Sequence, residues 1–501
     1  MAAPLPSSPF TIQELHGKHL HFMGIGGSGI TAAAQIALRA GAIISACDQD
    51  LSKTTRWMEQ LGISVAQGHS ADHAAEIDLL VITSAIIKLN PHHPEVMAAQ
   101  NHGIPVIEWQ ALLGAYMDGK MGVSIAGVHG KGTVTSMLST AIIEAGLDPT
   151  CEVGAIVPAW GSNIRFGDGN ILINEADEFN YQFMYYHPRI AIFNAIEYDH
   201  PEFFSGYDDI LNAFYGFTRN IDMSDAWPIP PTVVVNAGSP GCLDLAGKLA
   251  DWPGRIVTFA MEQNADYMGY NLRLEGETSF SVRGPGGREM GSVSLRMPGG
   301  YNAQNALAAF AVSDLLGADI EAARRALNNF SGIRRRFQMT QAENDILIID
   351  DYAHHPTAIR LTLEAIRARY PNRRLVAVFQ PNLFSRVKKF LDPFSHAFGS
   401  ADIAVIIDIM PAREVDTGLV HARDLTAATQ KDEAFARRNS AAYYGGSLDE
   451  TRALLETLAQ PGDILALLGS GTVYRVSEAL LESPAFLGSK SYSATKASDH
   501  V

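Results

Sequence analysis

The chain has 501 residues, which at about 150 residues per domain predicts about three domains. Hydrophobic residues make up 47% and charged residues 18%, so a sizeable core is expected and an intrinsically disordered chain is excluded. The 38 Lys and Arg residues are outnumbered by 54 Asp and Glu residues, which argues against nucleic-acid binding through a basic face. Three cysteines are too few for a disulfide scaffold, and no apolar run is long enough for membrane insertion. We therefore expect a cytoplasmic globular protein.

Short apolar runs alternate with helical patterns along most of the chain, which is typical of α/β domains with parallel sheets. Strands that lead through a loop into a helix are predicted at residues 19–23, 123–126 and 346–349. The first helix is expected to end at Gly41 after burying Ile30, Ala34, Ala37 and Leu38. The third helix is expected at 357–369, before a strand at 375–379. Joints between domains are predicted near residues 118–120 and 331–336.

The first loop has the spacing G-x-G-x-x-G between a strand and a helix. Its residues are Gly24, Gly26, Gly27, Ser28 and Gly29. Glycines at these positions let backbone N–H groups approach a diphosphate at the start of a helix. Asp48 follows Gly29 by 19 residues, close to where an acid that binds a ribose would lie. The motif fits a dinucleotide, a UDP-sugar or an ordinary tight turn.

The second loop resembles a shortened P-loop, because Ile125 stands where a strict Walker A motif has its first glycine. Backbone donors would surround phosphates, Lys131 would reach the β and γ oxygens, and a following hydroxyl would bind Mg²⁺. The alternative is a glycine-rich turn with a solvated lysine. The expected nucleotide contacts are Gly127, His129, Gly130, Lys131, Gly132 and Thr133.

Ionisable residues follow two further predicted strands. Residues 171–173 lead into Glu175, Asp177 and Glu178, and residues 191–193 lead into Glu197, Asp199 and His200. A strand that ends in acids is where α/β proteins place Mg²⁺ ligands. The alternatives are an acidic surface turn and a histidine with a purely structural role.

Three later segments carry polar groups with two interpretations each. Asn302 and Asn305 open an apolar helix and either cap it or bind the edge of a base. Residues 334–336 are three arginines at a domain joint, suited to phosphate or simply solvated. The neighbouring His354 and His355 project differently, so they are not expected to share one metal ion.

Taken in chain order, seven segments resemble motifs of the Mur ligase family. They read GIGGSG, EADE, IEYDHP, GGYNAQNA, GIRRRF, DDYAHHP and FQPNLFSR. The resemblance extends from His21 to about Ser477 and is greatest for the branch of the family that adds L-alanine. The branch that recycles the murein tripeptide shares EADE and DDYAHHP and is the alternative.

The resemblance implies an α/β fold with three domains. A Rossmann-like domain that binds the UDP substrate is expected at 1–120, a central P-loop ATPase domain with a parallel sheet at 121–333, and a Rossmann-like domain that brings the amino acid at 334–501. The polar tail from about residue 485 is expected to be disordered.

The resemblance also implies a reaction, in which ATP and Mg²⁺ drive the joining of L-alanine to UDP-N-acetylmuramate through an acyl phosphate. This ligase of peptidoglycan precursor synthesis is expected to be a monomer or a weak homodimer. A non-catalytic nucleotide-binding relative remains an alternative. An NAD(P)-dependent oxidoreductase is a further alternative, but that function would not explain the second loop or the acidic motifs.

By resemblance, Lys131 is the P-loop lysine of the family, and Glu175 and His200 are its magnesium-binding residues. Thr133 would supply the hydroxyl for Mg²⁺. The remaining nucleotide contacts implied are Asn302 and Asn305 at the adenine, Arg336 at the phosphates and Asp351 at the ribose. Lys131, Glu175, His200 and Arg336 are the expected catalytic residues.

On the substrate side, the resemblance places the glycine loop and Asp48 near the UDP group. Ser84, Ala85 and Ile86 match a second UDP-binding loop, and His354, Asn382 and Arg386 lie near the presumed amino-acid site. The sequence departs from the family pattern at four positions, where Val128, Gly132, Tyr301 and Asn382 replace the usual residues. Thr133 is expected to take over Mg²⁺ binding from the hydroxyl missing at Gly132.

Overall fold

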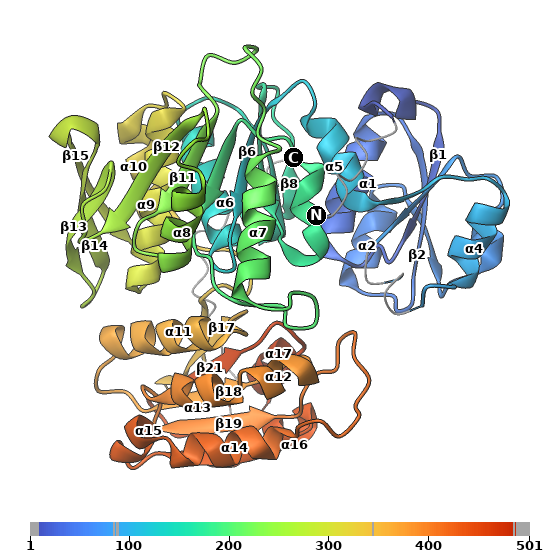
Figure 1. Cartoon of the computed structure of the whole chain (residues 1–501). Coiled ribbons are helices and arrows are strands. Elements are labelled where there is room, and N and C mark those ends of the chain that lie inside the picture. The colour runs from blue at the N-terminus through green and yellow to red at the C-terminus, as the bar shows by residue number, and fades with distance from the viewer. Residues whose placement is uncertain (1–9, 84–85, 87–89, 343–344, 484–485, 487–501) are drawn as a thin grey trace.

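The computed structural model describes residues 10–83, 86, 90–342, 345–483 and 486. The chain forms three α/β units, each built on its own sheet, which follow one another from blue to red in Figure 1. This arrangement confirms the expected three-domain α/β fold. Within the described part of the chain, no helix is long and apolar enough to cross a membrane. Except for Phe486, the tail predicted from about residue 485 lies outside the described residues.

The N-terminal unit is a five-stranded parallel sheet in the order β3-β2-β1-β4-β5. Its strands are β1 (His19–Met23), β2 (Ile43–Asp48), β3 (Ser64–Gln67), β4 (Leu79–Ile82) and β5 (Val106–Glu108). Its helices are α1 (Ser28–Arg39), α2 (Lys53–Gln60), α4 (Pro94–Asn101) and α5 (Trp109–Met117). The strand order reverses between β1 and β4, and ligands bind at the carboxyl ends of such sheets where the order reverses. The glycine loop follows β1 and therefore lies at this point.

The sequence pattern wrongly assigned one residue to the buried face of α1. Leu38, predicted to be buried, is 36% exposed. Ala33 and Ile36 are buried as well, so the buried face of the helix is centred closer to them and Leu38 lies at its edge.

The middle unit has a ten-stranded sheet in the order β15-β14-β13-β12-β11-β10-β6-β9-β7-β8. Its strands are β6 (Met121–Ala126), β7 (Thr150–Val157), β8 (Ser162–Arg165), β9 (Ile171–Ala176), β10 (Ile190–Phe193), β11 (Thr232–Asn236), β12 (Arg255–Met261), β13 (Tyr267–Arg273), β14 (Thr278–Arg283) and β15 (Glu289–Leu295). Its helices are α6 (Lys131–Glu144), α7 (Tyr207–Thr218), α8 (Pro240–Lys248), α9 (Gly300–Leu315) and α10 (Ile320–Asn329).

The sheet of the middle unit is parallel in its centre and antiparallel at both edges. β8 at one edge and β14 and β15 at the other pair antiparallel with their neighbours. Short connections join these strands to their neighbours, and such connections favour antiparallel pairing. In the parallel centre β6 lies between β10 and β9. The loops after these three strands therefore meet at one edge of the sheet.

The C-terminal unit is a six-stranded sheet in the order β16-β17-β21-β18-β19-β20, in which only β16 is antiparallel. Its strands are β16 (Gln338–Gln341), β17 (Leu347–Asp351), β18 (Leu375–Phe379), β19 (Ile403–Ile407), β20 (Ala441–Gly446) and β21 (Ile464–Leu468). Its helices are α11 (Pro356–Arg369), α12 (Phe384–Lys389), α13 (Leu391–Ser395), α14 (Ala422–Lys431), α15 (Glu433–Arg437), α16 (Leu448–Leu458) and α17 (Tyr474–Glu482).

An aromatic side chain joins the N-terminal and middle units. Trp109 packs against the apolar clusters of both units. Its ring lies so close to α1 that a Cβ built on Gly29 would be 2.2 Å from Trp109 Cζ2. Across the same interface, the Asn163 side chain donates a hydrogen bond to the backbone oxygen of Ser28. The last glycine of the G-x-G-x-x-G loop is therefore required by domain packing.

A buried ion pair joins the middle and C-terminal units. Arg386 is 2% exposed, and its Nε and Nη2 atoms lie 3.1 and 2.9 Å from Asp199 Oδ1. Its Nη1 donates to Asn382 Oδ1 at 3.0 Å. Nearby, the Thr357 hydroxyl donates to Glu197 Oε2 at 2.9 Å. These contacts hold the C-terminal unit against the strand ends of the middle unit, as Figure 1 shows.

We expect Arg386→Met to separate the C-terminal unit from the middle unit. Loss of one partner leaves the Asp199 charge buried without compensation, at a cost of about 3–5 kcal/mol. Small-angle X-ray scattering should show a larger radius of gyration than for the unchanged protein. The control is Arg374→Met, which breaks the Arg374–Asp463 pair inside the C-terminal unit. An unchanged radius of gyration in Arg386→Met would show that apolar contacts alone hold the units together.

Candidate active site

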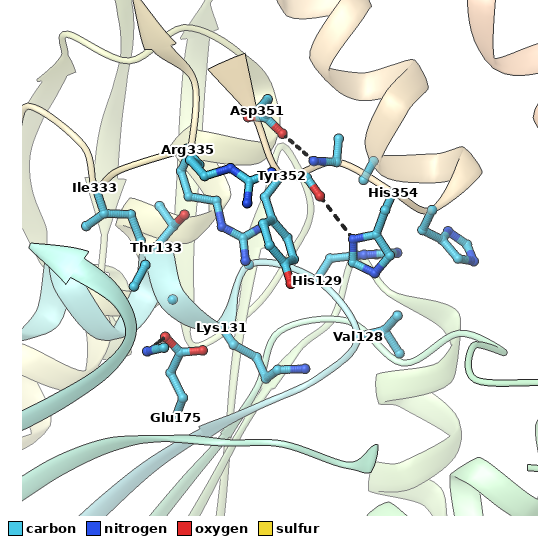
Figure 2. A pocket seen from close by; sticks show the side chains of 18 of the residues that line it. Val128, His129, Lys131, Thr133, Glu175, Ile333, Arg335, Asp351, Tyr352 and His354 are labelled. Atoms are coloured by element: carbon cyan, nitrogen blue, oxygen red, sulfur yellow. Dashed lines mark hydrogen bonds between the residues drawn. The ribbon is translucent and has the colours of Figure 1, made fainter. Parts of the chain in front are cut away.

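One large cleft, with a volume of ≈ 1970 Å³, lies between the three units. Ligand pockets commonly enclose about 300–1,000 Å³, so this cleft has room for more than one ligand. Figure 2 shows side chains of the middle unit, among them Lys131 and Glu175, facing Asp351, Tyr352 and His354 of the C-terminal unit. The N-terminal unit contributes Ser28, Gly29, Trp109 and residues 50–54.

The P-loop connects β6 to α6 and ends in a left-handed glycine. Gly130 is the N-cap of α6 with φ 81°, and Lys131 is the first helical residue. A Cβ on Gly130 would lie 2.3 Å from Asn194 Nδ2, so only glycine fits there. The loop thus presents backbone N–H groups at a helix N-terminus, the arrangement that binds phosphate.

Lys131 is buried among acids of the EADE segment. Its Nζ lies 2.7 Å from Glu178 Oε2 and 3.6 Å from Asp177 Oδ1. Burial opposes the positive charge, but Glu178 and Asp177 outweigh this effect and raise the pKa of Lys131. Lys131 is therefore a permanent cation, and a phosphate that binds it must replace Glu178.

Glu175 lies against the P-loop in a space that two glycines leave open. Its Oε1 accepts a short hydrogen bond from the Gly154 N–H. A Cβ on Gly132 would lie 2.8 Å from the same oxygen. Burial raises the pKa of Glu175, so a nearby cation would favour its ionised form. Gly132, a departure from the family pattern, thus makes room for the Glu175 carboxylate.

The group of atoms best placed for a cation differs from the predicted one. Ligand atoms of Asp177, Glu178 and His200 lie within 4.8 Å of one another. Glu175 and Thr133, predicted as ligands together with His200, line the same cleft but do not belong to this group. From the sequence, Asp177 and Glu178 were named among the acids that follow β9, but the assignment of metal ligands included only Glu175 from this segment.

A second group at the unit boundary contains two histidines and an acid. Ligand atoms of His129, Glu197 and His355 lie within 4.8 Å of one another. Burial opposes ionisation of Glu197, but the hydrogen bond and charge of His129 and the charge of His355 lower its pKa to about 2. His354 points elsewhere, with Nδ1 3.0 Å from the Tyr352 oxygen (Figure 2). The two adjacent histidines thus have different partners, as their sequence positions predicted.

The asparagines predicted at the adenine do not cap α9, whose N-cap is Gly299. Asn302 donates to the Pro298 oxygen at 2.8 Å. Asn305 Oδ1 accepts from Asn194 Nδ2 at 2.9 Å. Both side chains line the cleft, and Asn305 connects α9 to the segment after β10.

The arginines of the hinge differ in their contacts. Arg336 stacks over the Tyr352 ring at 4.7 Å, and its guanidinium makes no hydrogen bond or ion pair with a described residue. Arg335 instead donates to the Gly469 oxygen at 2.7 Å. Asp351 accepts from the Phe337 and Ala353 N–H groups, so its carboxylate fixes the hinge backbone. Arg336, which lines the cleft, is therefore available to a phosphate, and Arg334 lines the same cleft.

Several residues predicted on the substrate side have other partners. Asp48 Oδ2 accepts from the Gly26 N–H at 2.7 Å and so occupies a donor of the glycine loop. Ile86 lies beside that loop, 3.7 Å from a Cβ built on Gly24, and the predicted Ser84 and Ala85 lie outside the described residues. Asn382 and Arg386 do not line the cleft, because the interdomain ion pair engages them; His354 does line it.

Comparison with known proteins covers most of the chain. The model "Mur ligase family, catalytic domain" matches residues 19–121, "Mur ligase middle domain" matches 125–313, and "Mur ligase, glutamate ligase domain" matches 335–471. The UDP-N-acetylmuramate–L-alanine ligase of Salinibacter ruber is 35% identical over 93% of this chain and 94% of its own. That of a Geobacter species is 36% identical over 93% of this chain and 98% of its own.

Solved structures show the same architecture. The UDP-N-acetylmuramate–alanine ligase of Thermotoga maritima superposes with a TM-score of 0.76 at 25% identity, over 93% of this chain and 98% of that one. A murein peptide ligase of Psychrobacter arcticus shares the fold with a TM-score of 0.69 at 24% identity, over 93% and 98%. With the P-loop, the acidic strand ends and the hinge arginine gathered in one cleft, the chain belongs to the Mur ligase family.

Proposed function

We propose that the protein is an ATP-dependent ligase that joins L-alanine to the carboxylate of UDP-N-acetylmuramate. The observation that carries this proposal is the single cleft, in which the P-loop lysine, the acidic strand ends and the free hinge arginine face the N-terminal unit. The curated relatives named as UDP-N-acetylmuramate–L-alanine ligases support the choice of substrates.

The reaction needs activation because a carboxylate is a poor electrophile. The substrate carboxylate attacks the γ-phosphorus of ATP, ADP leaves, and an acyl phosphate forms. The amine of L-alanine then attacks the acyl carbon, phosphate leaves with the bonding electrons, and the amine loses a proton. Bringing a carboxylate to about 4 Å from a phosphate charge costs about 4 kcal/mol at an effective dielectric of about 20. Lys131 and Arg336 offset this repulsion.

Magnesium fits the acidic edge of the cleft. Asp177, Glu178 and His200 would hold it, together with Glu175 and the Thr133 hydroxyl on the P-loop side. Its charge would neutralise phosphate oxygens. Burial raises the pKa of Glu175, and a cation at this edge would offset that effect, which supports the assignment.

The two threonines that follow Gly132 are predicted to differ in their effect on turnover. The Thr135 hydroxyl already donates to the Lys131 oxygen at 2.9 Å, whereas the Thr133 hydroxyl has no hydrogen bond to any described residue. We expect Thr133→Val to lower turnover by about tenfold or more at limiting Mg²⁺, and Thr135→Val to have a mild effect. Turnover measured over a Mg²⁺ series tests this. If both variants kept the turnover of the unchanged protein, neither hydroxyl would contact the ion.

Gly132→Ala is expected to impair the site although alanine is a better helix former than glycine. The new Cβ would lie 2.8 Å from Glu175 Oε1, so the carboxylate must move. We expect reduced turnover and a higher Mg²⁺ requirement, with an unchanged melting temperature. The control is Gly247→Ala in α8, where a Cβ would meet no atom within 4 Å. Wild-type turnover in Gly132→Ala would show that Glu175 has no role in catalysis.

The proposed function itself is tested by phosphate release. We expect release with ATP, UDP-N-acetylmuramate and L-alanine, and far less with other amino acids or with the murein tripeptide. Lys131→Ala should abolish it and still bind the UDP substrate in calorimetric titration, because the glycine loop belongs to a different unit. Preference for the tripeptide would assign the chain to the recycling branch. Absence of release with every acceptor would show a non-catalytic relative.

A further inference from the structure

We propose that the N-terminal unit contains a structural zinc site formed by His21, Cys47, His73 and Glu95. One ligand atom from each of these side chains lies within 4.8 Å of the other three. They come from β1, β2, the 3-10 helix Ala71–Ala74 and α4, and none of them lines the cleft. Two imidazoles, a thiol and a carboxylate are a donor set that suits tetrahedral Zn²⁺.

The donor atoms converge on the Glu95 carboxylate, to which the Cys47 thiol also donates. His21 Nε2 lies 3.0 Å and His73 Nδ1 3.3 Å from the same oxygen, Glu95 Oε1. Both nitrogens are buried, and neither has a hydrogen-bond partner among the described residues. Buried polar atoms are rarely left unpaired, because the loss costs about 1–3 kcal/mol each. A central ion would satisfy both nitrogens and the carboxylate at once.

The spacing of the atoms is close to that of a zinc site. Zn–N and Zn–S bonds of about 2.0–2.3 Å in a tetrahedron separate neighbouring ligand atoms by about 3.3–3.8 Å. Cys47 Sγ lies 3.5 Å from Glu95 Oε1, and the two histidine nitrogens lie 3.0 and 3.3 Å from it. The three separations that involve Glu95 thus lie within a few tenths of an ångström of the tetrahedral values, and the other three are at most 4.8 Å.

Burial explains why the cluster would favour a divalent cation. His21 is 2% exposed, and Cys47 and Glu95 are fully buried. Burial and the adjacent Glu95 raise the pKa of the Cys47 thiol. Zn²⁺ would compensate the Glu95 charge and bind the sulfur as thiolate, with the thiol proton released to solvent. His69 Nδ1, 3.2 Å from Cys47 Sγ, adds a polar neighbour at the rim.

A hydrogen bond outside the cluster orients one of the ligands. His21 Nδ1 lies 2.8 Å from the Ser45 hydroxyl oxygen. In the tautomer in which Nδ1 donates to that hydroxyl, Nε2 carries the lone pair that faces the cluster. Partners of this kind fix the orientation of metal-binding histidines.

The position of the site indicates what it would stabilise. The Cys47 backbone oxygen accepts from the Gly24 N–H at 2.8 Å and the Ile25 N–H at 3.2 Å. The next residue, Asp48, accepts from the Gly26 N–H. A zinc ion on Cys47 would therefore anchor the end of β2, against which the glycine loop rests.

The test is the metal content of the full-length protein after incubation with Zn²⁺ under a phosphine reductant and exhaustive dialysis. We expect one zinc ion per chain in the wild type and in Cys242→Ala, which removes another buried free cysteine. Cys47→Ala and His73→Ala should lose it. Replacement by Co²⁺ should give tetrahedral d–d bands and a thiolate-to-cobalt charge-transfer band that Cys47→Ala lacks. Ser45→Ala, with all four ligands intact, should bind Zn²⁺ about 10–100-fold more weakly.

The wild type alone is sufficient to overturn the proposal, so a variant that fails to fold does not leave it open. Dialysed wild-type protein with no zinc and no cobalt charge-transfer band would show that the cluster is only a buried imidazole–carboxylate group. Zinc retained equally by a folded Cys47→Ala would place the ion elsewhere in the chain. A chelator should lower the melting temperature of the wild type and leave that of His73→Ala unchanged.

Discussion

The arrangement of the site depends on a concentration of negative charge at one edge of the middle sheet. Because β6 lies between β9 and β10, the loops after β9 and β10 bring carboxylates to the N-terminus of α6, which follows β6. Only Lys131, the partial charge of that helix and the charges brought by the C-terminal unit oppose them. Lys131 of the P-loop, the hinge arginine and the arginines of the docked third unit all bring positive charge toward this edge.

The same charge explains how the units are joined. Asp199, at the end of the strand that leads to His200, is paired with Arg386 of the C-terminal unit. Glu202 is paired with Arg413 from that unit as well. In contrast, Trp109, hydrogen bonds and an exposed Arg39–Asp168 pair connect the N-terminal and middle units. The interface between the middle and C-terminal units therefore depends on buried ion pairs, and the interface between the N-terminal and middle units depends mainly on close packing. Both border the same cleft.

The sequence predicted the features that depend on local pattern. β1 and β18 lie where the apolar runs placed them, and the P-loop begins α6 at Lys131. Contacts that depend on domain docking could not be predicted, because Asp199 and Arg386 are 187 residues apart and no periodicity relates them. The burial of Glu178 beside Lys131 was missed for a similar reason, since the three acids of the EADE segment give no sign of which one turns inward. Asp48, predicted beside a ligand, also accepts a hydrogen bond from the glycine loop itself, a contact that the sequence did not indicate.

The Arg386–Asp199 pair also limits how tightly any anionic ligand directed at Arg386 is bound. The folded chain holds the Asp199 carboxylate next to the Arg386 guanidinium, so a carboxylate ligand from solution has to compete with Asp199. The observed affinity for such a ligand is then its intrinsic affinity multiplied by the fraction of molecules in which the Arg386–Asp199 pair is broken. A substitution on Asp199, far along the chain from α12, would change ligand affinity without touching the ligand. The affinity for a ligand directed at Arg386 would in that sense report the equilibrium between the docked and separated arrangements of the middle and C-terminal units.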